Sequence, residues 1–226
     1  MTPLRHRPRQ KGRLIMKKER TKKEEPQGFA ASVWTLVHDL VYILAAITLV
    51  FTFAVRLVGV SGSSMYPTLV GGEEFAGNRG DYLALCSNVL KSSYAKGDIV
   101  VACIPTFEEG KPIVKRVIAT EGQTVDLREA EPGVWKVFVD GVALDEPYIR
   151  EPMSNAYAST PLPATVPEGC YFCMGDNRNN SSDSRVASIG MIDGRYIVGK
   201  AILNVLPGSD AMNGNQTTWS RFGGIG

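Results

Sequence analysis

The chain has 226 residues, which suits one medium-sized domain with an appendage, and 44% of them are hydrophobic, so a core can form. The formal net charge is only +2, but residues 1–25 contain ten Lys or Arg against three Glu, a local balance of +7 that leaves −5 elsewhere. Such a tail can bind nucleic acid, but it has no aromatic residue and no basic face follows it, so the composition argues against that partner.

The N-terminal segment, residues 1–32, is predicted to be a basic cytoplasmic tail. It lacks apolar periodicity as far as residue 28 and has the composition of a disordered segment. Met16-Lys17-Lys18 resembles a second start, so Met1 and Met16 both stay open as the first residue.

The only long apolar run extends from Trp34 to Val60, and its uninterrupted part, Leu40 to Val55, would be a helix of about 24 Å. Asp39 and Arg56 flank this part and can reach the membrane interface. We predict a single transmembrane anchor over 33–58. The basic flank then places the N-terminus in the cytoplasm and residue 59 onward outside. A cleaved signal peptide and a buried core helix are the alternatives.

Residues 59–207 predict a mainly β domain. Runs rich in Val, Ile, Tyr and Phe are punctuated by Gly, Pro, Asn and Asp, and no helical stripe is sustained. The expected strands are Tyr82–Cys86, Asp98–Cys103, Ile113–Thr120, Thr124–Leu127, Val134–Val139, Cys170–Met174 and Tyr196–Leu206. Residues 141–167 contain five prolines and predict an extended surface loop, and 208–226 predict a flexible tail.

A serine-rich loop, Ser61 to Thr68, follows the apolar run directly. Its glycine, proline and hydroxyls can hold a serine in a special conformation, so Ser64 is a candidate nucleophile, although an ordinary turn has the same composition. The two histidines, His6 and His38, lie in the tail and at the inner edge of the anchor, which excludes a Ser-His-Asp triad in the domain. The base must then be a carboxylate or a lysine.

Lys115 is the lysine that stands out. On a strand it shares one face with Ile113, Val117 and Ala119, so it projects from an otherwise apolar surface. Burial there would lower its pKa, which a general base near neutral pH requires. The alternative is an edge-strand lysine that faces water.

A polar cluster extends from Gly175 to Arg185. It fails as a calcium loop, and its two Asp and two Arg predict a buried ion-pair scaffold with Arg116 as a further partner. The four cysteines, Cys86, Cys103, Cys170 and Cys173, lack zinc spacing and are expected to be small buried apolar residues. We expect no metal and no cofactor.

Four motifs together resemble the ordered motif set of bacterial type I signal peptidases. The resemblance covers roughly Val33 to Pro207 and rests on Ser64-Met65-Tyr66-Pro67-Thr68, Lys96-Gly97-Asp98-Ile99-Val100, Lys115-Arg116-Val117 and the whole run Gly175 to Arg185. It implies antiparallel sheets that form a partly open β domain with a small β insertion, about 124–167, behind one transmembrane helix.

The resemblance also implies a membrane-anchored serine endopeptidase that removes signal peptides with a Ser-Lys dyad. Ser64 matches the nucleophile and Lys115 the general base. The supporting positions are Ser181, which positions the lysine, Met65 beside the substrate cleft, and the polar scaffold of Asp176, Asp183, Arg185 and Arg116. The implied substrates are preproteins with Ala-x-Ala-like cleavage sites. The enzyme would act at the outer face of the bacterial cytoplasmic membrane, in contact with lipid and close to the export translocon.

One position departs from some family members, which carry a serine two residues before the nucleophile as a donor in the oxyanion hole. Here that residue is Gly62, so the hole is expected to depend on backbone N–H groups, mainly that of Ser64. A self-cleaving Ser-Lys protease domain and a non-catalytic anchored β module that binds surface partners are the alternative functions.

Overall fold

The computed structural model describes residues 28–72, 78–91, 93–210, 214, 216–217 and 219–225. The chain divides into two compact units, one that ends at Leu44 and one that begins at Ala45. Most of the predicted N-terminal tail and both candidate start residues lie outside the described residues.

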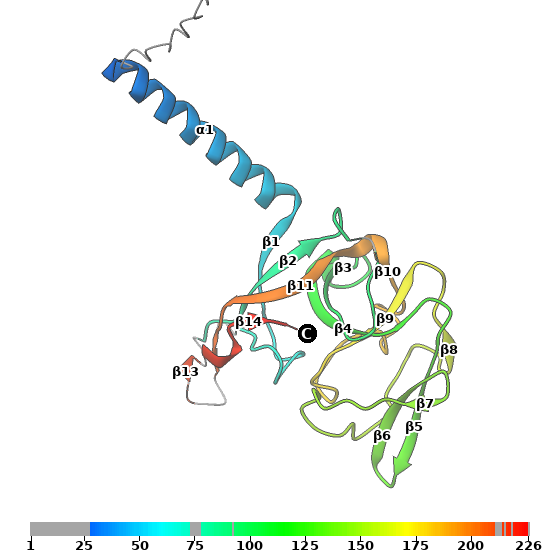
Figure 1. Ribbon diagram of the computed structural model, residues 1–226. Coiled ribbons are helices and arrows are strands. Elements are labelled where there is room, and N and C mark those ends of the chain that lie inside the picture. Colours follow the sequence, from blue (N-terminus) through cyan, green and yellow to red (C-terminus); the bar gives the residue numbers. More distant parts are fainter. Residues whose placement is uncertain are drawn as a thin grey trace, which may run out of the picture. The chain divides into compact units, whose positions relative to one another are not determined.

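Helix α1 spans Phe29–Phe53 (Figure 1). Its segment Ala31–Phe53 is long and apolar enough to cross a membrane, by its length and composition. The predicted anchor, 33–58, is wrong at its end, because Val55–Gly59 forms strand β1 and pairs with β2 (Tyr82–Ser87). Hydropathy alone does not separate an apolar strand from the helix that precedes it.

The main sheet has eight antiparallel strands in the order β1-β2-β11-β3-β4-β9-β10, with β14 paired to β11. Its further members are β3 (Ile99–Cys103), β4 (Pro112–Thr120), β9 (Cys170–Met174), β10 (Ile192–Asp193), β11 (Ile197–Leu206) and β14 (Gly223–Gly224). Strand β4 lies between β3 and β9, so its residues are in the interior of the sheet.

A second sheet is formed by the insertion between β4 and β9 (Figure 1). Its order is β7-β6-β5-β8, with β5 (Thr124–Glu131), β6 (Val134–Val139), β7 (Val142–Ala143) and β8 (Ala164–Thr165). Asp140 and Gly141 join β6 to β7 with φ of 53° and 80°, the left-handed conformation that a two-residue hairpin requires. The predicted fold class, antiparallel sheets with a small β insertion behind one apolar helix, is confirmed.

The C-terminal segment, predicted as a flexible tail, is partly paired. Strands β12 (Ser209–Asp210) and β13 (Gln216–Thr217) pair with each other, and β14 pairs with Leu203 and Asn204 of β11. Ile225 packs against the core cluster that contains Met65. The prediction was therefore wrong for these residues, since pairing across the chain overrides a Gly-, Asn- and Ser-rich composition.

Alternation on β3 distributes its side chains between two core clusters: Ile99 and Val101 enter one, and Val100 and Ala102 enter the other. Both faces of the sheet are therefore covered near β4. A register shift between Val117 and Ala119 moves Ala119 into a third cluster with residues of the insertion, so the predicted shared face does not extend to Ala119.

Candidate active site

A serine and a lysine meet where the loop after β1 approaches the centre of β4. Lys115 Nζ lies 2.8 Å from Ser64 Oγ and 3.0 Å from the carbonyl oxygen of Val114. The two residues are 51 positions apart in the sequence. The sheet therefore brings together the two residues that the sequence singled out.

Lys115 is 4% exposed, so the alternative of an edge lysine facing water is wrong. Burial is the largest influence on its amine and lowers its pKa to about 8, against the opposing effect of the Asp183 carboxylate. A lysine with this pKa is partly neutral near pH 7 and can accept a proton.

The pair opens onto a cleft of about 490 Å³. Its walls are the end of β1, the loop from Ser61 to Met65, the start of β4 and the residues around Ser181. Gly62 has a φ of +73°, a conformation that a serine at this position would adopt only with strain. Met65 lines the cleft while being 1% exposed, since its side chain also belongs to the core.

Ser181, expected to position the lysine, lines the same cleft. Its Oγ is buried, and the Ser181 side chain acts on the nearby Asp183 carboxylate, whose pKa it helps to lower. A contact between Ser181 and Lys115 stays a prediction. Gly175 explains how closely the loops approach, because a Cβ there would lie 2.3 Å from Ser181 Oγ and 2.4 Å from the Ser64 carbonyl oxygen. Any larger residue would separate the two loops.

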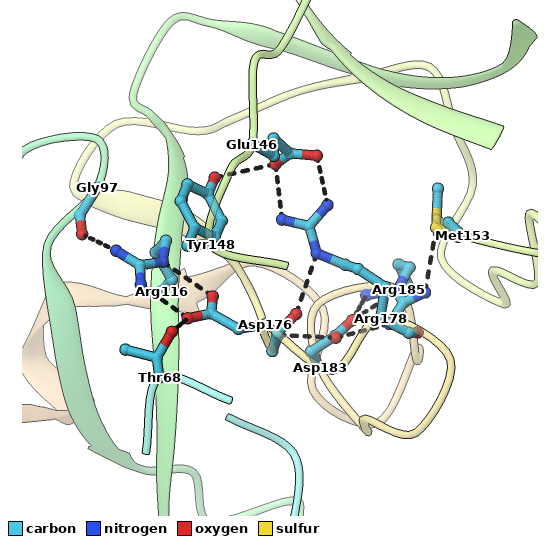
Figure 2. Close-up of polar contacts among 11 residues, drawn as sticks. Thr68, Gly97, Arg116, Glu146, Tyr148, Met153, Asp176, Arg178, Asp183 and Arg185 are labelled. Atoms are coloured by element: carbon cyan, nitrogen blue, oxygen red, sulfur yellow. Dashed lines mark hydrogen bonds and ion pairs between the residues drawn. The ribbon is translucent and has the colours of Figure 1, made fainter. Parts of the chain in front are cut away.

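The predicted ion-pair scaffold is present (Figure 2). Arg116 donates to both oxygens of Asp176 at 2.8 and 2.7 Å, and Thr68 Oγ1 donates to the same carboxylate at 2.6 Å. Arg185 donates to both oxygens of Asp183 at 2.8 Å. Burial acts to raise the pKa of Asp183, but the bonds and charge of Arg185 outweigh it and hold that pKa below its usual value.

Sequence reasoning missed the contribution of the insertion to this scaffold. Glu146 accepts from both terminal nitrogens of Arg178 at 2.7 and 2.6 Å, and the Arg178 Nε donates to the Gly175 carbonyl oxygen at 3.0 Å. Tyr148 donates to Glu146 and lies against Arg116, whose guanidinium carbon is 4.0 Å from the ring centroid (Figure 2). The segment predicted as a surface loop therefore has residues inside the polar network.

Two asparagines of the polar cluster were also missed. Asn177 is fully buried; its backbone N–H donates to the Ser64 carbonyl oxygen at 3.0 Å and its side chain donates to the Ser63 carbonyl oxygen at 3.1 Å. Asn180 donates to Ser63 Oγ at 3.0 Å. A run of Asn in a polar loop gives no sign in the sequence of which backbone groups it will meet.

The cysteines differ partly from expectation. All four are free thiols, but only Cys173 is buried, while the other three are partly exposed. Burial raises the pKa of the Cys173 thiol, which keeps it protonated and inert. Within the described residues, no group of three or more His, Cys, Asp or Glu is arranged to hold a metal ion.

A hydroxyl in contact with a buried amine, in a cleft of an antiparallel β domain, is the arrangement of a serine hydrolase that uses lysine as its base. The family model described as "Signal peptidase, peptidase S26" matches residues 33–206. The chain therefore belongs to the signal peptidase family, peptidase S26.

Individual relatives agree with this assignment. A probable signal peptidase I-1 of Synechocystis sp. is 36% identical over 157 residues, 66% of this chain and 70% of that protein. Signal peptidase I of Bacillus licheniformis is 34% identical over 173 residues, 74% of this chain and 83% of its own length. A probable signal peptidase I of Mycobacterium leprae is 30% identical and covers 87% of this chain and 80% of that protein.

Proposed function

We propose that this chain is a membrane-anchored serine endopeptidase that removes N-terminal signal peptides from exported preproteins, with Ser64 as nucleophile and Lys115 as general base. The observation that carries the proposal is the 2.8 Å contact between Lys115 Nζ and Ser64 Oγ in a cleft open to solvent. Membership of the signal peptidase family supplies the reaction class.

The chemistry follows from the protonation state of Lys115. Neutral Lys115 takes the proton from Ser64 Oγ as that oxygen attacks the scissile carbonyl carbon. The protonated amine then gives its proton to the departing amine of the mature protein. Water, deprotonated by the same lysine, releases the signal peptide from the ester on Ser64. With a pKa of about 8, about one tenth of Lys115 is neutral at pH 7.

Membrane attachment fits a substrate that is itself embedded in the bilayer. Helix α1 is long and apolar enough to span it, and the basic flank favours a cytoplasmic N-terminus with the catalytic domain outside. Enzyme and signal peptide then share one lipid surface close to the translocon, which raises their effective concentration. Small side chains before the cleavage site, as in Ala-x-Ala, are the expected specificity.

The test uses the full chain in proteoliposomes with a preprotein that carries an Ala-x-Ala site. We expect cleavage by the wild type and none by Ser64→Ala or Lys115→Ala. Lys136→Ala, which removes an exposed lysine of β6, is the control and should cleave at the wild-type rate. Retained cleavage in both site variants would contradict the dyad, and cleavage of the chain itself in place of the preprotein would favour a self-processing protease.

A further inference from the structure

We infer that Asn177 is a positioning residue that sets the backbone of Ser64 so that its N–H faces the oxyanion of the reacting substrate. This inference rests on the proposed function and adds a residue to it. It starts from one observation: the side chain and the backbone N–H of Asn177 donate hydrogen bonds to the two carbonyl oxygens on either side of the Ser64 Cα.

The contacts are specific. The Asn177 side-chain NH₂ donates to the Ser63 carbonyl oxygen at 3.1 Å, and the Asn177 backbone N–H donates to the Ser64 carbonyl oxygen at 3.0 Å. The first bond fixes the peptide plane before Ser64, and the second fixes the plane after it. Two fixed planes determine φ and ψ of Ser64, and with them the directions of its N–H and its side chain.

The direction of the Ser64 N–H follows from planar geometry. The Ser63–Ser64 peptide is trans, so its N–H points opposite to its C=O. That C=O is directed at Asn177 and also accepts the Tyr66 N–H at 3.1 Å. The Ser64 N–H is therefore directed away from Asn177, and within the described residues it donates to no acceptor. A donor without a partner beside the nucleophile is what an oxyanion hole requires.

The Asn177 side chain is fully buried, and its Oδ1 accepts no hydrogen bond from the described residues. Its NH₂ group makes the contact, because the Ser63 carbonyl oxygen can only accept. Asn180 adds a third bond, to Ser63 Oγ at 3.0 Å. Because Gly62 provides no hydroxyl, a correctly aimed Ser64 N–H carries more of the oxyanion stabilisation in this chain.

Two variants test the inference in the full chain. Asn177→Ala removes the side-chain donor, and Asn177→Asp keeps the shape but cannot donate to the Ser63 carbonyl. We expect kcat to fall about 100-fold in both, because a small misplacement of a reacting group has effects of this size. KM should stay within about threefold, because the buried Asn177 side chain does not line the cleft.

Inhibition by a peptide aldehyde distinguishes a misdirected Ser64 N–H from a general loss of folded protein. A substrate-based peptide aldehyde inhibits when Ser64 Oγ adds to its carbonyl carbon and the Ser64 proton passes to Lys115, which leaves the oxyanion on the adduct. Its inhibition constant should rise in Asn177→Ala by about the same factor as kcat falls. The acidic limb of the pH profile should be unchanged in this variant, because Asn177 is not among the groups that shift the pKa of Lys115.

The matched control is Asn204→Ala, which removes another buried asparagine, 1% exposed, on β11. It reports the effect of losing a buried amide away from the cleft, and its thermal unfolding is compared with that of the Asn177 variants. Wild-type kcat in Asn177→Ala would overturn the inference, as would an equal loss in Asn204→Ala. An intact aldehyde inhibition constant would overturn it too. The proposed function is tested separately, by activity in the wild type and its absence in Ser64→Ala.

Discussion

Lys115 and Arg116 are neighbours on β4 and almost equally buried, 4% and 3% exposed, yet their surroundings differ. Arg116 donates twice to Asp176, once to the Gly97 carbonyl oxygen, and lies on the ring of Tyr148. Lys115 contacts a hydroxyl and one backbone carbonyl. None of the described carboxylates forms an ion pair with it.

The difference teaches that partners, and not burial, decide what a buried cation does. Arg116 is compensated by a carboxylate in fork geometry and serves as structure. Lys115 has no ion-pair partner among the described carboxylates, so burial lowers its pKa although the nearby Asp183 carboxylate opposes this. Strand alternation makes this possible, because consecutive residues face opposite sides and one faces the cleft while the other faces the scaffold.

Lys115→Arg should remove the difference between positions 115 and 116, because it places a guanidinium in the cleft as well as in the scaffold. A guanidinium stays protonated in proteins and cannot act as a base. We expect kcat/KM for preprotein cleavage to fall by about 10³-fold or more. Activity within tenfold of the wild type, in the same proteoliposome assay, would show that Lys115 does not act as the base.

Asp176→Asn removes the carboxylate that compensates Arg116. A buried guanidinium without its partner should lower the free energy of unfolding by about 3–5 kcal/mol, measured by denaturant titration of the full chain in detergent. The control is Asp193→Asn, whose pair with Arg195 is as short, 2.6 Å against 2.7 Å, but exposed. Equal effects in the two variants would mean that burial is irrelevant to the pair.

Glu146→Gln extends the comparison to the insertion. Gln keeps one acceptor for Arg178 but not the charge, so we expect a loss of about 2–3 kcal/mol in the free energy of unfolding. Glu151→Gln, on the same segment and exposed, is the control. A loss no larger than in this control would show that the insertion does not stabilise the scaffold.

The sequence predicted the strand pattern well, because β-branched runs and turn residues are local signals. It also singled out Lys115, because both histidines lie outside the β domain and the face of β4 is apolar, and the order of the four family-like motifs singled out Ser64. The sequence did not predict the roles of Glu146, Tyr148 and Asn177, because these roles depend on contacts between residues that are distant in the chain. Glu146 and Arg178 are 32 positions apart in the sequence, and Asn177 and Ser63 are 114 apart, so no local sequence pattern predicts these contacts.

The pH dependence of cleavage tests whether Lys115 titrates near neutral pH. The pKa of Lys115 is lowered from 10.5 to about 8, so the neutral fraction grows about tenfold per pH unit below 8 and levels above it. We expect kcat/KM to follow this curve between pH 6 and 9, measured on the wild type with one preprotein. A profile that stays flat down to about pH 5 would contradict a lysine base.

Lys115→Met should stabilise the protein while abolishing activity. The folded state disfavours the protonated amine, so below pH 8 wild-type folding carries a cost that methionine avoids, and we expect a gain of about 1–3 kcal/mol in the free energy of unfolding. Because the folded-state pKa lies below the unfolded value, the wild type regains this stability as the pH rises from about 8 to 10.5. The gain from methionine should therefore shrink over that interval.

Lys136→Met, at an exposed position of β6, is the control and should change neither the stability nor the activity. A Lys115→Met variant less stable than the wild type at pH 7 would mean that the bonds of the amine to Ser64 and Val114 outweigh its desolvation.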